Sequence, residues 1–434
     1  MARSIIAPAE RVTNLRWGIA VLLGIGVLIN YFDRVNITVA GPSLQKEFGI
    51  DDIQFGYLLS AFGWTYAALQ IPIGAFLDRY GVVVIGRVTT LLWAIASALT
   101  GLANGFVTMF AARLLLGVAE TPTFPINAKA VGYWFPLKER GLATAIFDSA
   151  AKIATGIGVP IVAVILALYG WRMTFFVTAF FSLLFFIAFY VFYRNPSEAK
   201  NLTHAERTYI AEGGAQPEGL TTAGNVGAAL GYLLRQRKVW GLTIGFSAYG
   251  YSFYLLLTWL PGYLVKTYHM NIIKTGAYAM VPWLVAGVAD LIVGGWLVDN
   301  LVQRGYEQTR VRKTIIVIGM LMGLTIIGAA FTTNPNVAIV WITIALTGLA
   351  CSAPIGWSIP SLISPRGSVG TIGGIMNFFN NVMSILAPIV TGYIVAGTSS
   401  FANAFITAAI VLLIGIVGYV WVLGTIEPIP EPGG

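Results

Sequence analysis

Long apolar runs separated by short polar intervals dominate the chain. Each run holds about the 20 residues that a helix needs to cross the hydrocarbon core of a membrane. Membrane-spanning β-strands would instead show segments of about 10 residues with alternating polarity, and these runs are longer and lack that alternation. The pattern therefore predicts an all-α membrane protein with twelve transmembrane helices, at residues 17–43, 53–77, 82–103, 105–134, 139–168, 171–194, 237–266, 273–302, 312–332, 335–362, 367–396 and 400–424.

One polar interval, residues 195–236, is far longer than the others. It opens with Asn195-Pro-Ser-Glu198 and continues through a charged stretch into several glycines. Such a composition is typical of a linker between folded units. We expect an N-terminal six-helix bundle at residues 1–194, a linker at 195–236 and a C-terminal six-helix bundle at 237–434.

The two halves repeat each other weakly, at an offset that stays near 220 residues. Three matches come in the same order on equivalent loops: Pro42 to Gly56 with Pro261 to Gly276, Gly74 to Arg79 with Gly295 to Asn300, and Arg140 to Pro160 with Arg366 to Pro388. Duplicated halves usually hold a substrate at their interface near the membrane midplane, and access alternates as one half rocks against the other. The repeat therefore favours a carrier with two pseudo-symmetric bundles over a channel or an enzyme.

The composition supports a membrane protein, since 57% of the residues are hydrophobic and only 10% are charged. Soluble domains carry about 25% charged residues. A net charge of +8 would suit a nucleic-acid partner, but 18 of the 26 basic residues lie in the N-terminal tail and the even-numbered loops. This positive-inside bias places both termini and the linker in the cytoplasm. We expect a multi-pass protein of the cytoplasmic (inner) membrane of a bacterium, without a nucleic-acid partner. The odd-numbered loops hold only Lys46, Arg172, Lys266 and Lys274.

The residues that metal sites and hydrolase triads require are scarce. Cys351 is the single cysteine, and the two histidines, His204 and His269, fall in loops on opposite sides. No phosphate-binding Gly-x-x-x-x-Gly-Lys-Ser/Thr occurs. We therefore expect no metal, no cofactor and no enzymatic activity.

Ionisable residues in the first and fourth predicted helices point to a function. Asp33 and Arg34 lie inside an apolar run, where an ionisable group costs about 2.5–3.5 kcal/mol and usually marks a solute or proton path. Adjacent helical residues point about 100° apart, so these two need partners from elsewhere. Arg113 and Glu120 are seven residues apart and share one helical face. The fourth helix is therefore the expected source of partners.

These four residues are open to two interpretations. They form static ion pairs that only orient the helices, or they act in transport. Protonating Asp33 and Glu120 would leave excess positive charge in a wet cavity, which favours an anion, and a guanidinium suits a carboxylate by bidentate hydrogen bonding. We therefore hypothesise proton-coupled symport that imports an organic anion, with Arg34 and Arg113 on the substrate and Asp33 and Glu120 carrying protons.

The fifth helix carries a further charge pair. Asp148 and Lys152 are four residues apart and can pair along the helix. Either this is a structural salt bridge, or Lys152 holds a second substrate carboxylate. Asp290 in the eighth helix is expected to be structural, and Lys129 is expected to reach toward the membrane surface.

The helix count and one loop motif resemble the major facilitator superfamily. The motif is Gly74-x-x-x-Asp78-Arg79-x-Gly81, between the second and third helices, with a degenerate copy at Gly295 to Asn300. By this resemblance the loop latches the two halves together on the cytoplasmic side. The alternative is a solvated turn that only helps topology. The expected latch residues are Gly74, Asp78, Arg79 and Asp299.

Two further motifs are similar to the anion:cation symporter branch, which includes bacterial galactonate, glucarate and hexuronate carriers. They are Asn30-Tyr31-x-Asp33-Arg34 and Arg113-x-x-x-Gly117-x-x-Glu120. The resemblance implies that Arg34 holds the substrate carboxylate, that Asp33 and Glu120 are protonation sites, and that Arg113 couples to Glu120. The substrate would then be a sugar acid, such as an aldonate, an aldarate or a hexuronate.

The sugar-acid carriers of this branch also line their cavity with aromatic and amide side chains. A tyrosine or tryptophan joins a polar handle to an apolar body, which suits a polyhydroxylated acid. The same residues could serve packing alone. The positions that look like these lining residues are Tyr31, Tyr66, Trp357 and Asn377.

Two rival functions remain open. An organophosphate or phosphate antiporter would also need paired arginines, but it has less use for the acids at Asp33 and Glu120. A nutrient sensor would bind its ligand in the same cavity without moving it. Under each alternative we expect a monomer in the lipid bilayer with a small anion as its partner, and the symporter would also bind protons.

Overall fold

The computed structural model describes residues 13–136, 139–216, 218, 226–365 and 369–430, and within these ranges it is helical without any strand. The first half comprises α1 (Leu15–Phe48), α2 (Asp52–Gly101), α3 (Phe106–Glu120), α4 (Thr123–Trp134), α5 (Arg140–Tyr169) and α6 (Trp171–Phe192). Two shorter helices follow, α7 (His204–Glu212) and α8 (Val226–Leu233). The second half comprises α9 (Arg237–Tyr268), α10 (Ile272–Ala289), the π-helix η2 (Asp290–Leu297), α11 (Val298–Gln303), α12 (Gln308–Gly323), α13 (Ile326–Ala330), α14 (Pro335–Ile363), α15 (Val369–Thr398), α16 (Ala402–Val417) and the π-helix η3 (Gly418–Val422).

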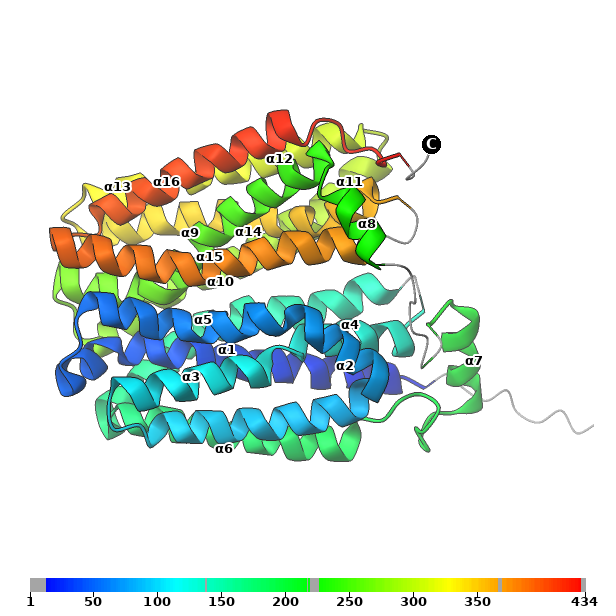
Figure 1. Ribbon diagram of the computed structural model, residues 1–434, viewed down its shortest axis with the longest axis horizontal. Helices are drawn as coiled ribbons and strands as arrows, with labels where there is room; N and C mark the ends of the chain where they lie inside the picture. The colour runs from blue at the N-terminus through cyan, green and yellow to red at the C-terminus, as the bar shows by residue number, and fades with distance from the viewer. Residues whose placement is uncertain (1–12, 137–138, 217, 219–225, 366–368, 431–434) are drawn as a thin grey trace, which may run out of the picture.

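The helices form two groups that lie side by side. Figure 1 shows α1 to α6 in the lower part of the view and α9 to α16 in the upper part, which confirms the predicted all-α architecture of two bundles. The groups meet where α2 packs against α15 and where α5 packs against α10. We call the end that carries α7, α8 and the C terminus the terminal end, and the opposite end the distal end (Figure 1).

The predicted spans correspond to helices. Within the described residues, nine helical stretches are long and apolar enough to cross a membrane. The other three predicted spans, 53–77, 105–134 and 237–266, are also helical and lie in α2, in α3 with α4, and in α9. The hydropathy pattern therefore located the helices correctly.

Of the interruptions within the helices, the break between the second and third spans was predicted, and the π-helix in the eighth span was not. The second and third spans both lie in α2, and the chain turns between them at Gly81, where φ is 75° and ψ is 169°. The fourth span breaks between α3 and α4 at Pro122, which has no backbone N–H to continue the helix. The eighth span passes into the π-helix η2 at Asp290. Hydropathy detects neither the break at Pro122 nor the π-helix, because both alter the hydrogen-bond register and leave the apolar pattern intact.

A buried ion-pair network fixes α7 to the first half at the terminal end. Arg16 Nη1 lies 2.9 Å from Glu206 Oε1, and Arg16 Nε lies 2.8 Å from Glu139 Oε2. Glu206 is fully buried and also accepts hydrogen bonds from the backbone N–H groups of Leu15 and Arg16 and from the hydroxyl of Thr13. The part of the predicted linker that forms α7 therefore belongs structurally to the first half.

Glycines allow α2 and α15 to approach closely at the distal end. A Cβ at Gly56 would collide with the backbone carbonyl of Pro388, and a Cβ at Gly392 would collide with that of Asp52. Gly63 lies in the same way against the Ser384 hydroxyl. We call this contact between the halves the glycine seam.

Gly319 and Gly348 make the corresponding contact inside the second half, between α12 and α14. A Cβ on either glycine would overlap the carbonyl oxygen of the other. Replacing Gly319 by Ala should force the two helices apart and destabilise the fold by about 1–3 kcal/mol, as overpacking typically does. The measurement is the thermal unfolding temperature of the purified protein in detergent.

Gly373→Ala is the matched control, because a Cβ at this helical glycine of α15 would meet nothing within 4 Å. The control should change stability by no more than about 0.5 kcal/mol. Equal unfolding temperatures for the two variants would contradict the proposed contact.

Candidate functional site

A buried ion pair joins α1 to the end of α3. Arg34 Nε lies 3.2 Å from Glu120 Oε2, and the exposed fractions of the two side chains are 7% and 0%. The predicted partnership between the first and fourth spans is therefore confirmed. Arg34 Nη2 and Glu120 Oε1 have no hydrogen-bond partner among the described residues. The pair is held by one hydrogen bond and keeps one donor atom and one acceptor atom unused.

Aromatic rings surround the guanidinium of Arg34. Its Cζ lies 4.8 Å from the ring centroid of Tyr31, 4.5 Å from that of Phe62 and 5.2 Å from that of Tyr66. Phe62 and Tyr66 stack on each other with centroids 5.1 Å apart. Ring faces stabilise a cation without neutralising it, so the guanidinium can still bind an anion. Tyr31 and Tyr66 were predicted at this site, whereas Phe62 was not.

Asp33 is held by uncharged donors. Trp93 Nε1 donates to Asp33 Oδ2 at 2.6 Å, Ser97 Oγ donates to Asp33 Oδ1 at 2.7 Å, and Ser182 Oγ donates to Asp33 Oδ2 at 3.3 Å. Arg113 Nη1 reaches the backbone carbonyl of Asp33 at 3.2 Å and not its carboxylate. Asp33 therefore has a polar pocket of its own, adjacent to the Arg34 pair.

Arg113 is buried close to this group. Its Cζ lies 5.7 Å from the ring centroid of Phe62, which places Arg34 and Arg113 beside one ring. Arg113 makes no ion pair with Glu120 among the described residues, and its Nε has no hydrogen-bond partner there. The coupling that the resemblance implied is therefore not a direct contact in this conformation.

Lys152 forms a second charged group, which spans the two halves. Its Nζ lies 2.7 Å from Asp148 Oδ2 on the same helix, as the spacing predicted, and 2.9 Å from Asp290 Oδ2 at the start of η2. The side chain of Asp148 is 41% exposed, whereas that of Asp290 is 4% exposed. Asp290 was expected to be structural, and its contact with Lys152 across the interface was not predicted.

Tyrosines from both halves lie near the two charged groups. Tyr31 lies against Arg34, and Lys152 and Asp148 are its other charged neighbours. From the second half, Tyr254 lies near Arg34 and Tyr249 lies near Lys152. The first and second halves therefore both contribute to one polar region.

The remaining predicted lining residues lie in the second half. Trp357 in α14 is 48% exposed and packs edge-to-face on Phe246, with centroids 5.2 Å apart. Asn377 in α15 is partly buried. Within the described part of the chain, neither makes a hydrogen bond to Arg34 or Lys152. In this conformation no hydrogen bond among the described residues therefore links them to these two first-half residues.

The predicted latch is described only in part. Arg79 is exposed, with its guanidinium 5.3 Å from the ring centroid of Tyr80. Gly74 and the side chains of Asp78 and Asp299 lie outside what the structure describes. Their role stays a prediction.

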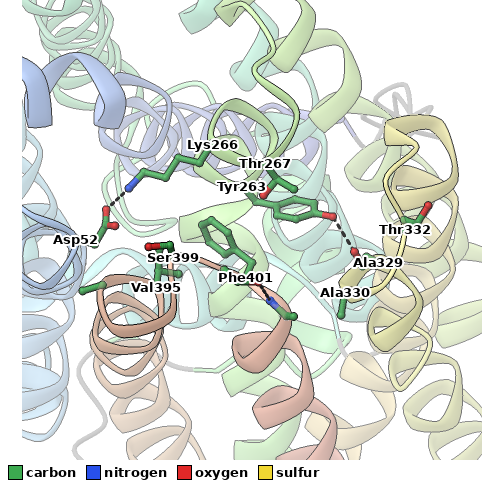
Figure 2. A pocket seen from close by; sticks show the side chains of 13 residues that line it. Asp52, Tyr263, Lys266, Thr267, Ala329, Ala330, Thr332, Val395, Ser399 and Phe401 are labelled. Atoms are coloured by element: carbon green, nitrogen blue, oxygen red, sulfur yellow. Dashed lines mark hydrogen bonds and ion pairs between the residues drawn. The ribbon is translucent and has the colours of Figure 1, made fainter.

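A pocket of about 420 Å³ opens at the distal end, away from all predicted substrate residues. Figure 2 shows Lys266 pointing to Asp52 of the first half, with which it forms an ion pair, and the Tyr263 hydroxyl pointing to the carbonyl of Ala329. At the same end the hydroxyls of Tyr57 and Tyr393 lie 3.3 Å apart. The contacts of Asp52 with Lys266 and of Tyr57 with Tyr393 join the two halves on the distal side, whereas Tyr263 and Ala329 both belong to the second half.

Sequence reasoning missed Trp93, Ser97 and Ser182 as partners of Asp33. A signal existed for the first two: they are four residues apart in the third span and therefore share a helical face. Among the described residues, no group of three or more histidine, cysteine or acidic side chains could hold a metal ion.

Comparison with known proteins gives the family. Residues 23–388 match the family model of the Major Facilitator Superfamily. The uncharacterized transporter YybO of Bacillus subtilis is 39% identical over 97% of both chains. The probable galactarate/D-glucarate transporter GarP of Escherichia coli is 33% identical over 95% of this chain and 96% of its own. The D-galactonate transporter of Escherichia coli O6:H1 is 32% identical over 94% and 95%.

The fold is also found in a solved structure. The inward-facing, occupied crystal structure of a bacterial homolog of the human lysosomal transporter Spinster superposes with a TM-score of 0.76, over 95% of this chain and 98% of that one, at 16% identity. The family and these relatives are transporters and not enzymes, which confirms the predicted class. The helical bundles, the family match and the full-length relatives together show that this chain belongs to the Major Facilitator Superfamily and is a multi-pass membrane transporter.

Proposed function

We propose that this transporter is a proton-coupled symporter that imports a sugar acid across the inner membrane. The buried pair of Arg34 and Glu120 is the observation that carries the proposal. Relatives named as galactarate, glucarate and galactonate transporters support the substrate class.

At this pair, the need to balance buried charge couples the binding of the substrate to the binding of a proton. A substrate carboxylate on Arg34 would set two carboxylates against one guanidinium in a buried place, and uncompensated buried charge is strongly unfavourable. A proton on Glu120 removes the excess negative charge. Arg34 can then turn both its Nε and its free Nη2 toward the substrate, in the bidentate geometry that suits carboxylates.

Asp33 serves as a second proton site in this proposal. Ser97 donates to one of its carboxylate oxygens, and a hydroxyl can either donate or accept. When Asp33 binds a proton, the hydrogen bond to Ser97 can reverse its direction without leaving a buried group unpaired. Arg113, which lies at the Asp33 backbone, adds positive charge that attracts the anion.

The aromatic surroundings fit the rest of a sugar acid. Tyr31, Tyr66 and Tyr254 offer hydroxyls on apolar rings close to Arg34. Sugar hydroxyls can exchange hydrogen bonds with these groups while the carbon chain lies against the rings. Trp357 and Asn377 would join the site when the halves close around the substrate.

Access would alternate by rocking of the halves at 1–194 and 237–434, with residues 195–236 as the cytoplasmic linker. Both termini would lie in the cytoplasm, so the distal contacts of Asp52 with Lys266 and of Tyr57 with Tyr393 would close the outer side. The latch at Gly74, Asp78, Arg79 and Asp299 would act on the inner side.

Replacing Glu120 by Gln should separate exchange from accumulation. Glutamine resembles the protonated acid, so Arg34 can still bind a carboxylate, but no proton is released. Proteoliposomes with an alkaline interior and no counter-substrate should then fail to concentrate labelled D-galactonate, while exchange across the membrane continues.

Glu47→Gln is the control for that experiment, because Glu47 is an exposed carboxylate paired with Arg172 outside the site. It should accumulate substrate like the wild type. Concentrative uptake by Glu120→Gln would refute the proton assignment, and uptake that always requires a counter-substrate would favour an antiporter.

Replacing Arg34 by Lys should weaken substrate binding. Lysine keeps the charge but cannot form the bidentate fork, and a hydrogen bond to a charged group is worth about 1.5–3 kcal/mol. The dissociation constant for D-galactonate should rise by about tenfold or more, as measured by calorimetric titration of the purified protein.

Arg172→Lys makes the same exchange at an arginine that pairs with Glu47 away from the site. Its affinity should match that of the wild type. An unchanged affinity in Arg34→Lys would remove Arg34 from the substrate site.

A further inference from the structure

The charged group around Lys152 carries more negative than positive charge. One ammonium lies between two carboxylates, 2.7 Å from Asp148 Oδ2 and 2.9 Å from Asp290 Oδ2. The first half supplies Asp148 and the second half supplies Asp290. Asp290 is buried, and its Oδ1 has no partner among the described residues. Lys152 is therefore already occupied, and the group keeps a net negative charge with an unused acceptor.

The helix that carries Arg34, α1, packs against α5, which carries Asp148 and Lys152. Tyr31 contacts the Arg34 guanidinium, and Lys152 and Asp148 are its other charged neighbours. The partly exposed Asp148 lies on the side of α5 that meets the second half, because Lys152, one turn away, reaches Asp290 there. A substrate held by its carboxylate at Arg34 would extend past Tyr31 toward this acidic group.

We infer that the transporter selects sugar acids with a single carboxylate and a hydroxyl-bearing far end, and that Asp148 and Asp290 impose this selection. The inference rests on the proposed sugar-acid function. A second carboxylate would become a third anion around one ammonium, and like charges at such distances repel strongly in buried surroundings. A terminal hydroxyl instead donates a hydrogen bond to Asp148 or to the free oxygen of Asp290. The alternative that Lys152 grips a second carboxylate requires a free ammonium, which the structure does not provide.

The two halves act together in this selection. Either aspartate alone would neutralise Lys152 and leave a group without net charge. Only the combination of Asp148 and Asp290 makes the far end of the site acidic. The selection against dicarboxylates should therefore be strongest when the halves are in contact at this point.

D-galactonate and galactarate provide the test, because they share one six-carbon chain and differ only in the group at carbon 6, a hydroxymethyl or a carboxylate. Binding to the purified full-length protein is measured for each by calorimetric titration. The wild type should bind D-galactonate about tenfold or more tightly than galactarate. Asp148→Asn and Asp290→Asn should each reduce the ratio of the galactarate to the D-galactonate dissociation constant. The double variant should bind galactarate more tightly than D-galactonate, because Lys152 is then unpaired.

Glu47→Gln is the control, since Glu47 is an exposed carboxylate that pairs with Arg172 of the same half, outside the site. Its ratio should equal that of the wild type. Equal or tighter binding of galactarate by the wild type would overturn the inference, and so would a ratio that the Asp148 and Asp290 variants leave unchanged. Binding of neither acid would refute the proposed sugar-acid function itself.

Discussion

The requirement that every buried charge be paired or hydrogen-bonded inside an apolar bundle governs this structure. Arg34 and Glu120 satisfy it with a single hydrogen bond and leave one polar atom unused on each side. Asp33 satisfies it through a tryptophan and two serines. Because each carboxylate has a different kind of partner, adding an anion or a proton disturbs each site differently. The proposed coupling follows from that difference, since a new carboxylate at Arg34 is tolerated only when Glu120 becomes neutral.

Contacts between the halves are of two chemical kinds. Lys152 with Asp290, and Lys266 with Asp52, join the halves by charge. The glycine seam joins them by shape alone. Charged contacts fix which residues face each other, because an ion separated from its partner in an apolar place is unfavourable. Backbone packing at the glycine seam fixes how closely the two halves approach each other. The polar region near Arg34 lies between helices that are held in register by both means.

Sequence reasoning correctly predicted the features that are determined within a single helix. Apolar length placed the spans, and spacing predicted that Asp148 would pair with Lys152 and that the fourth span would supply a partner for Arg34. The contact of Asp290 with Lys152 and the serine partners of Asp33 depend on how helices are rotated against one another, which spacing within one helix does not encode. The turn at Gly81 lies in the predicted loop between the second and third spans. The π-helix at Asp290 was missed because it changes backbone hydrogen bonding without changing hydropathy. The fold was therefore more predictable than the partners within the site.

The glycine seam determines how easily the distal end can separate. At Gly56 and Gly392 the two backbones meet by van der Waals contact, so the polar groups that lose partners when the distal end opens are those of Asp52, Lys266, Tyr57 and Tyr393. Dispersion attraction is short-ranged, so a small gap along the seam forfeits a large part of it. A single added methyl group would act as a wedge, and natural variation along this line could tune the resting conformation while every residue that contacts the solute stays the same.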